Sequence, residues 1–545
     1  MYNFTESELK NLNSCLKDDT PLGPIDGASI KNPDVAKILF EQDNQIYRNI
    51  TRRPSIVIGR RGSGKTSFLE HLKNHEYAGH VVVDVKLSGA IINIRNFVSL
   101  SSTQDLLPPE ESVAELWDWL FWTALYLQVK KQRPATFKRV KNDYSVGKKF
   151  ESWFANFQYS TLGNLANFFS SPNRKSNTLE TVSGAVLNSL PGFTSDRLNV
   201  LKRLVKICLK NSRSKAIILV DSLDQYEVEN KVNDRVLSGL IKSAGRFNSD
   251  LGRPEMRLCL PSELYFYFVE ISSNSLKDFA NDIKLHWHPR ELLSLAAGRY
   301  LTFLYCNRDR VDEKKLQALF EIRSEEGRNW GLRFWEEILP DKIVNRYGVE
   351  ENSVAYIIRH THLLPRQLIM FLNKIISLSI RANDSLLSVD ANLLTAALTR
   401  SESNVWGEVC NAYKASYPDA RKICIQAIPH LPLIFNVGEL QKVYTENVKP
   451  ISSTFSDDDM DVYKFERMLI EIGCIGLVQP NSSSDRYVEG LFEYNSLGQI
   501  MSNTDSVYCL HPMFCSVRTQ PKKNLTTKVI MPKGNEPDSA DYRSF

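Results

Sequence analysis

The 545-residue sequence lacks the features that would place a protein in a membrane or outside the cell. It has no uncharged apolar stretch of about eighteen residues, which a membrane-spanning helix needs. Its first residues, Met1–Glu6, show neither the basic nor the apolar region of a secretory signal. Its nine cysteines are scattered, odd in number and without C-x-x-C spacing. We therefore expect a cytoplasmic protein with reduced thiols and no membrane partner.

The sequence also lacks a strong charge of either sign. Its 68 Lys and Arg residues against 63 Asp and Glu give a net charge of only +5, so the global charge favours no class of partner. Hydrophobic residues at 42% and charged residues at 24% are ordinary for a globular protein. A chain of this length is too long for one core, so we expect about three or four domains.

The most informative stretch runs from Ser55 to Ser67. A short β-branched run, Ser55–Ile58, predicts a buried strand, and Lys65–Asn74 predicts a helix. The chain between them matches the phosphate-binding pattern G-x-x-x-x-G-K-[ST] at Gly59, Gly64, Lys65 and Thr66. The alternative is a glycine-rich turn with an exposed lysine. By average composition, a chance match in a chain this long arises on the order of a few per cent of the time.

The residue types of this loop suit a nucleoside triphosphate. Glycines let successive backbone N–H groups turn toward a phosphate, and the start of the helix adds partial positive charge. We expect Lys65 to reach the β- and γ-phosphates and the Thr66 hydroxyl to bind Mg²⁺. The predicted nucleotide-binding residues of the loop are Gly59, Gly62, Ser63, Gly64, Lys65, Thr66 and Ser67.

A second nucleotide motif is predicted at Lys215–Asp224. An apolar run that ends in Asp221 is typical of a Walker B strand, whose carboxyl end emerges beside the phosphate-binding loop. We assign Asp221 to Mg²⁺ and Asp224 to orienting or deprotonating the attacking water. The alternative role for either residue is a helix N-cap or a surface acid.

Three more strands are expected around these two. They are His80–Val85, a strand from Met256 that ends in the polar Ser262, and Asp282–Trp287. In ATPases with a strand inserted between the two Walker strands, a polar residue at its end senses the γ-phosphate, which makes Ser262 the candidate. Apolar helical patterns fill the long gap before Asp221, so we expect a helical insertion at about 100–210. The alternation predicts an α/β fold with a parallel sheet.

With both Walker elements placed, the chain resembles the STAND branch of AAA+-type P-loop ATPases, which is close to the origin-recognition ATPases. Proteins of this type carry a Gly-x-Pro element in a helical lid, and His362–Leu368 is similar to it. The glycine is absent, so Pro365 carries the resemblance and is implied to lie by the nucleotide. Arg366 is implied to be a lid arginine that reaches the γ-phosphate. Ser222 stands where many AAA+ enzymes have a catalytic glutamate, which fits a slow ATPase.

The expected architecture is therefore a P-loop NTPase parallel sheet with a helical insertion, a helical lid and a C-terminal winged-helix domain. A helix at Asp34–Asn49 would precede the sheet, and a Pro-, Lys- and Asn-rich tail would be disordered. The expected boundaries are 1–50 for the N-terminal helical segment, 51–290 for the ATPase core, 291–400 for the lid, 401–518 for the winged-helix-like domain and 519–545 for the tail.

Two positions could contact DNA. The stretch 130–149 carries eight basic residues against one acid, Asp143, and such a run either contacts phosphate backbones or is a solvated face. The third helix of the winged-helix-like domain carries only Lys464 and Arg467 among several acids. A major-groove reader would be expected to be more basic, so protein contact or lid function is as plausible there.

Two functions follow. The first is an ATP- and Mg²⁺-dependent switch that controls homo-oligomer assembly or a separate effector protein. The resemblance implies a role in bacterial anti-phage defence or signalling, and the chain has no recognisable effector domain of its own. The alternative is an ATP-controlled winged-helix DNA-binding protein, either a regulator or an initiator-like loader. A GTPase is disfavoured because no N-K-x-D element is found: Asn373-Lys374 is followed by two isoleucines.

Overall fold

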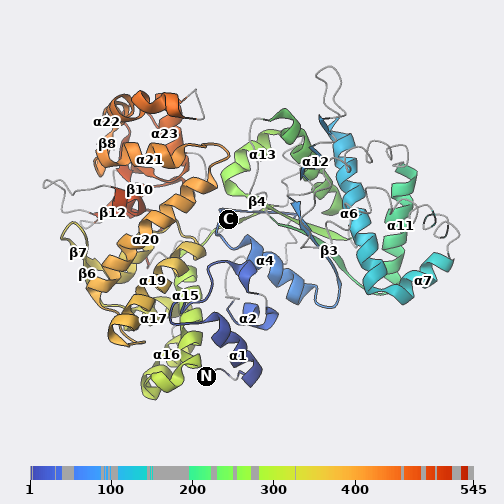
Figure 1. The fold of residues 1–545 in the computed structure, drawn as a ribbon, viewed down its shortest axis with the longest axis horizontal. Coiled ribbons are helices and arrows are strands. Elements are labelled where there is room, and N and C mark those ends of the chain that lie inside the picture. Colours follow the sequence, from blue (N-terminus) through green and yellow to red (C-terminus); the bar gives the residue numbers. More distant parts are fainter. Residues whose placement is uncertain are drawn as a thin grey trace. The chain divides into compact units, whose positions relative to one another are not determined.

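The computed structural model divides the chain into two compact units (Figure 1). The core unit comprises Asn49–Arg60 and Lys65–Leu285, and the helical unit comprises Met1–Arg48, Arg61–Gly64 and His286–Phe545. The residues that the structure describes are 2, 4–30, 32–39, 55–87, 91–92, 94–95, 98–99, 109–143, 148, 150, 152, 195–221, 230–248, 254–271, 282–325, 327–455, 460–479, 487–496, 500–517 and 529–537.

The core unit is built on a five-stranded parallel sheet. Its strands are β1 (Ile56–Gly59), β2 (Val81–Lys86), β3 (Ala216–Asp221), β4 (Glu255–Pro261) and β5 (Asp282–Leu285), in the order β2-β3-β4-β1-β5. Every neighbouring pair is parallel. The strand β4 lies between β1 and β3, so a strand separates the two predicted nucleotide motifs, as expected. The predicted α/β fold of a P-loop NTPase is confirmed.

Burial explains why these segments form strands. Every residue of β1 is buried, and in β3 only the final Asp221 is less than fully buried. Strands covered on both faces need apolar residues throughout, which is what the sequence supplies. Helix α4 (Lys65–His71), which continues as a π-helical turn, packs against β1 and β3. Helix α12 (Lys231–Asn248) contacts β4, and α13 (Tyr265–Ile271) packs against α12.

The helical insertion contains α6 (Glu110–Gln132), α7 (Pro134–Asp143) and α11 (Ser195–Asn211), which pack on one another (Figure 1). Helix α6 is apolar on almost all sides because it lies between α11 and α12. Its Trp117 is fully buried and donates a hydrogen bond from Nε1 to the Val236 carbonyl at 2.9 Å. Residues 144–147, 149, 151 and 153–194 of the expected insertion lie outside the described residues.

The helical unit begins with α1 (Glu6–Cys15) and α2 (Pro33–Ile38). The N-terminal helix expected at Asp34–Asn49 corresponds to α2, and residues 40–50 lie outside the described part of the chain. The lid region contains α15 (Pro289–Cys306), α16 (Glu313–Glu325), α17 (Trp330–Ile338), the hairpin of β6 (Lys342–Val344) and β7 (Glu350–Asn352), α18 (Ser353–Arg359), α19 (Pro365–Asn383) and α20 (Ala391–Ala412). Helix α20 runs through the boundary expected at 400, so the lid and the C-terminal region share one helix.

The C-terminal region has a second five-stranded sheet, in the order β12-β10-β9-β11-β8. The order of elements from helix α21 to strand β10 is that of a winged helix: helix, strand, two helices and a two-stranded ribbon. Residues 480–486, between β9 and β10, lie outside the described residues. The elements are α21 (Ala420–Ala427), β8 (Ile434–Asn436), α22 (Val437–Val443), α23 (Val462–Glu471), β9 (Ile475–Val478), β10 (Tyr487–Leu491), β11 (Val507–Leu510) and β12 (Val529–Pro532).

The expectation of a disordered tail at 519–545 is wrong for residues 529–537. Strand β12 pairs in parallel with β10, and its Val529, Ile530 and Met531 are buried. Beyond the strand, the Asn535 side chain donates hydrogen bonds to the carbonyls of Ile358 and Thr361 at 3.1 and 2.9 Å. The sequence signal was weak because a strand of this kind gains its partner from residues far away in the chain.

None of the helices in the described ranges is both long enough and apolar enough to cross a membrane.

Candidate functional site: the phosphate-binding loop and Asp221

The loop after β1 has the backbone shape that its glycines permit. Gly62 and Gly64 have φ values of +89° and +98°, in the left-handed region that favours glycine. The buried Lys65 side chain turns back along the loop, where Nζ donates to the carbonyls of Gly59 at 2.7 Å and Arg60 at 3.1 Å. An ammonium group has three donors, so these bonds hold the charge in the loop and leave one N–H for a ligand.

The two nucleotide motifs meet at the carboxyl ends of their strands. The Thr66 hydroxyl donates a hydrogen bond to Asp221 Oδ2 at 3.0 Å, although 155 positions separate the two residues. The contact follows from the parallel sheet, which ends β1 and β3 at the same edge. A hydroxyl beside a carboxylate supplies the hard oxygen ligands that Mg²⁺ prefers. Thr66 and Asp221 therefore fit the predicted Mg²⁺ by the chemistry of their oxygen atoms.

The middle of the loop, Arg61–Gly64, clusters with the helical unit. Trp287 Nε1 donates to the Ser63 carbonyl at 2.8 Å, and the Trp287 ring lies near Gly64. The Ser63 side chain is fully buried, and its hydroxyl has no hydrogen-bond partner among the described residues. A buried hydroxyl without a partner is costly, and a phosphate oxygen would satisfy it. The loop therefore fits the predicted nucleotide by its own chemistry.

Arg366, the predicted lid arginine, lies against the loop. A Cβ placed on Gly62 would be 3.1 Å from Arg366 Cβ and 3.7 Å from its Nε, so only glycine fits at position 62 without displacing the arginine. Arg366 Nε is buried and has no hydrogen-bond partner within the described part of the chain. Pro365 is buried at the first position of α19, where its fixed φ suits a helix start.

Leu363 is the residue at which the Gly-x-Pro element lacks its glycine, and its φ is +52°. The backbone thus has a left-handed conformation, which glycine adopts without cost and which strains a leucine. Position 363 therefore has the backbone conformation that a glycine favours, although a leucine occupies it.

The other predicted site residues divide by what the structure describes. Ser262 begins a short 3-10 helix directly after β4, between the ends of β1 and β3, and Ser67 lies half-buried in α4. Asp224 lies outside the described residues. Burial, with the Asp221 charge nearby, raises the pKa of the Cys259 thiol on β4, so this cysteine is not a nucleophile.

Sequence reasoning missed Trp287 and Leu363. Trp287 had been assigned only to a strand, although the end of β5 lies at the same sheet edge as the loop because β5 pairs with β1. A tryptophan directly after that strand was the available signal. Leu363 could be recognised as an unusual position only from its φ, which the sequence does not reveal.

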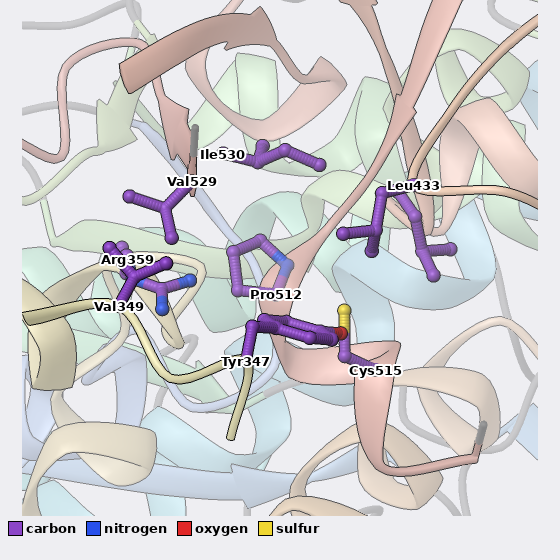
Figure 2. Close-up of a pocket in the computed structure, with 9 residues that line it drawn as sticks. Tyr347, Val349, Arg359, Leu433, Pro512, Cys515, Val529 and Ile530 are labelled. Carbon is purple, nitrogen blue, oxygen red and sulfur yellow. The ribbon is translucent and has the colours of Figure 1, made fainter. Parts of the chain in front are cut away.

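A small pocket lies elsewhere in the helical unit, and Figure 2 shows its lining. Its open space of about 340 Å³ includes solvent, and none of the predicted site residues lines it. The Arg359 guanidinium at its wall is already paired with Glu351 at 2.7 Å. Within the described residues, no group of three or more His, Cys, Asp or Glu side chains is arranged to hold a metal. The pocket is lined by Tyr347, Val349, Arg359, Leu433, Leu510, Pro512, Cys515, Val529 and Ile530.

Comparisons with known proteins add little to this site. No protein-family model matches the chain, and no curated protein matches it. Among solved structures, the ORC2 protein of Aeropyrum pernix, in ADPNP and ADP complexes, is similar at 12% identity, with 88% of this chain and 91% of that chain covered. Its TM-score of 0.35 is too low to support an argument about function. The fold class accordingly rests on the strand order and the position of the loop.

Proposed function

We propose that this chain binds ATP with Mg²⁺ at the phosphate-binding loop, hydrolyses it slowly, and works as a STAND- or AAA+-type switch. The switch would control the assembly of its own copies or a separate effector protein. The observation that carries this proposal is the hydrogen bond between Thr66 and Asp221, because it joins the predicted metal ligands of both nucleotide motifs at 3.0 Å.

Each residue of the site has a role in this proposal. Lys65 neutralises phosphate charge through its remaining N–H, and the loop amides around Gly62 and Gly64 donate to phosphate oxygens. Thr66 and Asp221 hold Mg²⁺, which shields the negative charge of the phosphates when it is bound. Asp224 orients or deprotonates the attacking water, Ser262 senses the γ-phosphate, and Pro365 packs beside the nucleotide.

A switch needs a link between the nucleotide and another part of the chain, and Arg366 is our candidate. It lies against Gly62 and is the second residue of α19, whose first residue, Pro365, directly follows the segment Thr361–Leu364. The Thr361 carbonyl accepts a hydrogen bond from Asn535 at 2.9 Å. A nucleotide that draws Arg366 toward its γ-phosphate would therefore pull on a segment bonded to the C-terminal region.

The proposal is tested by measuring ATP binding and turnover for the wild type, Lys65→Ala and Asp221→Asn. Loss of charge-assisted hydrogen bonds of about 1.5–3 kcal/mol should weaken ATP binding by Lys65→Ala roughly 10- to 150-fold. Asp221→Asn should lose most Mg²⁺-dependent turnover. The control is Lys73→Ala, because Lys73 pairs with Glu70 and Asp84 on the surface and such pairs contribute little.

Solution mass measured with and without nucleotide would test the switch. A wild type that neither binds nor hydrolyses ATP would refute the proposal, and full turnover by Asp221→Asn would remove the metal assignment. ATP-dependent assembly is expected for the wild type and not for Lys65→Ala.

No observation favours the alternative of a winged-helix DNA reader. On α23, the Arg467 guanidinium pairs with Glu471 at 2.7 Å, and Glu466 accepts a hydrogen bond from Tyr508. These acids offset the few basic residues that a major-groove helix would need.

A further inference from the structure

The described part of the helical insertion has a strongly basic surface. Helices α7 and α11 pack against each other, so two basic stretches that are far apart in the sequence come together. Within 130–143, 148 and 195–215, the exposed acids are Asp143 and Asp196. The exposed basic residues in the same ranges, here called the insertion basic surface, are Lys131, Lys138, Arg139, Lys148, Arg203, Lys210, Arg213 and Lys215.

Contacts at the ends of α6 and α11 hold part of this surface together. Arg133, just after α6, donates from Nε to the Ser214 hydroxyl at 2.9 Å and also donates to the Gly79 carbonyl. The chain leaving α6 is thereby fixed beside the turn that follows α11. On α11, Arg203 and Lys210 are seven residues apart, so they share one face of the helix.

Two acids of α6 are paired with basic residues that do not belong to the insertion basic surface. Asp118 is buried and pairs with Lys202 at 3.1 Å, and Glu111 pairs with Lys242 of α12 at 3.0 Å. Some of the basic residues lie in the last turns of α6 and α11, where a positive charge interacts favourably with the helix dipole and needs no ligand. The helix dipole does not explain Lys138 or Arg203, because each lies before the last turn of its helix.

The side chains around the insertion basic surface indicate which class of anionic partner it could bind. A helix that binds anionic membranes presents exposed apolar residues, and a single-strand binder presents exposed aromatic rings for stacking. Neither kind occurs on α6, α7 or α11 among the described residues. The exposed large hydrophobic side chains of the described chain are Ile25, Ile92, Val344, Ile425, Tyr463, Met501 and Val507. Charge without apolar or aromatic contacts fits the phosphate backbone of a duplex.

We propose that the insertion basic surface binds the phosphate backbone of double-stranded nucleic acid without reading its sequence. The surface belongs to the insertion and contains no residue of the phosphate-binding loop. The inference therefore goes beyond the proposed ATP switch and does not depend on it.

The test measures binding of a labelled DNA duplex of about 30 base pairs by fluorescence anisotropy, at salt concentrations from about 50 to 200 mM. The variant carries Lys138→Gln, Arg139→Gln, Arg203→Gln and Lys210→Gln. We expect the slope of log affinity against log salt to become less negative by about 3 to 4, at about 0.9 for each lost phosphate contact. At intermediate salt, the affinity should fall by at least about 10-fold.

The matched control removes the same charge from exposed positions on α16, α19 and α20: Lys314→Gln, Lys315→Gln, Lys374→Gln and Arg400→Gln. It should bind the duplex within about 2-fold of the wild type, because none of the four residues belongs to the insertion basic surface and salt screens the longer-range attraction between exposed charges and phosphates. Far-ultraviolet circular dichroism and thermal midpoints check that both variants fold.

Three results would overturn the inference. They are no duplex binding by the wild type at the lowest salt, equal loss in both variants, and preferential binding to phosphatidylserine vesicles. Duplex binding that survives Lys65→Ala would support the inference even if the ATP proposal failed.

Discussion

Leu363 holds a backbone conformation that most residues avoid, two residues before the start of the helix that carries Pro365 and Arg366. Its φ of +52° costs roughly 1–2 kcal/mol for a residue with a side chain. The surrounding contacts hold it there: the Thr361 hydroxyl accepts a hydrogen bond from the Leu363 amide at 3.2 Å, and the side chain is buried. Strain of this kind is concentrated at functional sites.

Replacing Leu363 by glycine should relieve this strain but lose a buried side chain. The neighbouring Leu364 is nearly as buried, at 7% exposed against 3%, and its φ of −111° is unstrained, so Leu364→Gly is the matched control. We expect Leu363→Gly to destabilise the protein by about 1–2 kcal/mol less than Leu364→Gly. Urea unfolding measures the free energy of unfolding of both variants. An equal decrease in the two variants would show that position 363 stores no strain.

At the residue scale, the sequence predicts those site residues that belong to a motif of fixed spacing or that end a recognisable apolar run. Lys65 and Thr66 belong to a contiguous motif, and Asp221 ends a run of apolar residues that only a buried strand needs. The contacts of Trp287 and the φ of Leu363 depend on packing between distant segments. No spacing in the sequence records such packing.

At the scale of elements, the strands of the core were predictable because each is a short apolar run that ends in polar residues. Strand β12 was not, because its three apolar residues gain a partner only once β10 is in place. Helix α20 continues through the boundary expected at 400, and its amphipathic pattern weakens there because the polar Ser401 and Glu402 are buried. Helix ends are decided by such tertiary contacts.

Removing β12 should destabilise the C-terminal region. A chain that stops after residue 528 loses the burial of Val529, Ile530 and Met531, which is worth at most about 9 kcal/mol at about 1.5–3 kcal/mol for each side chain. It also loses the hydrogen bonds from Asn535. A chain that stops after Pro537 keeps all of these contacts and is the control. Calorimetry should show a lower midpoint for the first truncation alone; equal midpoints would mean that β12 contributes nothing.

His360 should make stability depend on pH. It is buried, Nδ1 lies 2.6 Å from the Tyr356 carbonyl, and Nε2 lies 3.5 Å from Glu402 Oε1. Burial, and next the charge of Arg359, hold the pKa of His360 well below its usual range. The folded protein therefore keeps His360 neutral, whereas the unfolded chain protonates it at a pH below about 6.5. The contribution of neutral His360 to the free energy of unfolding is therefore fully present above about pH 6.5 and is lost as the pH falls below it.

His360→Gln should reduce this acid sensitivity. Between about pH 6.5 and pH 4.5, the unfolding free energy of the wild type should fall more steeply than that of the variant, by up to about 1.4 kcal/mol per pH unit. Urea titrations at several pH values measure the slope. His430→Gln, at an exposed position, should keep the wild-type slope. Identical slopes for the wild type and His360→Gln would contradict the prediction.

At the scale of the whole molecule, the ATP proposal predicts stabilisation by ligand. A ligand that binds only the folded state at 100 times its Kd adds about 2.7 kcal/mol to the free energy of unfolding. Mg²⁺-ATP should therefore raise the thermal midpoint of the wild type, and chelation of Mg²⁺ should reverse part of the shift. Lys65→Ala should show a much smaller shift, and an undiminished shift would mean that ATP binds elsewhere.

Helix α20 is unbroken from Ala391 to Ala412 and contacts both α19 and α21. A continuous helix has no loop at which it can bend, so no hinge lies within Ala391–Ala412. If the proposed switch is right, a tilt that Arg366 imposed on α19 would pass along α20 toward the second sheet. The expected output would then be a change in which face of that sheet a neighbouring protein can reach.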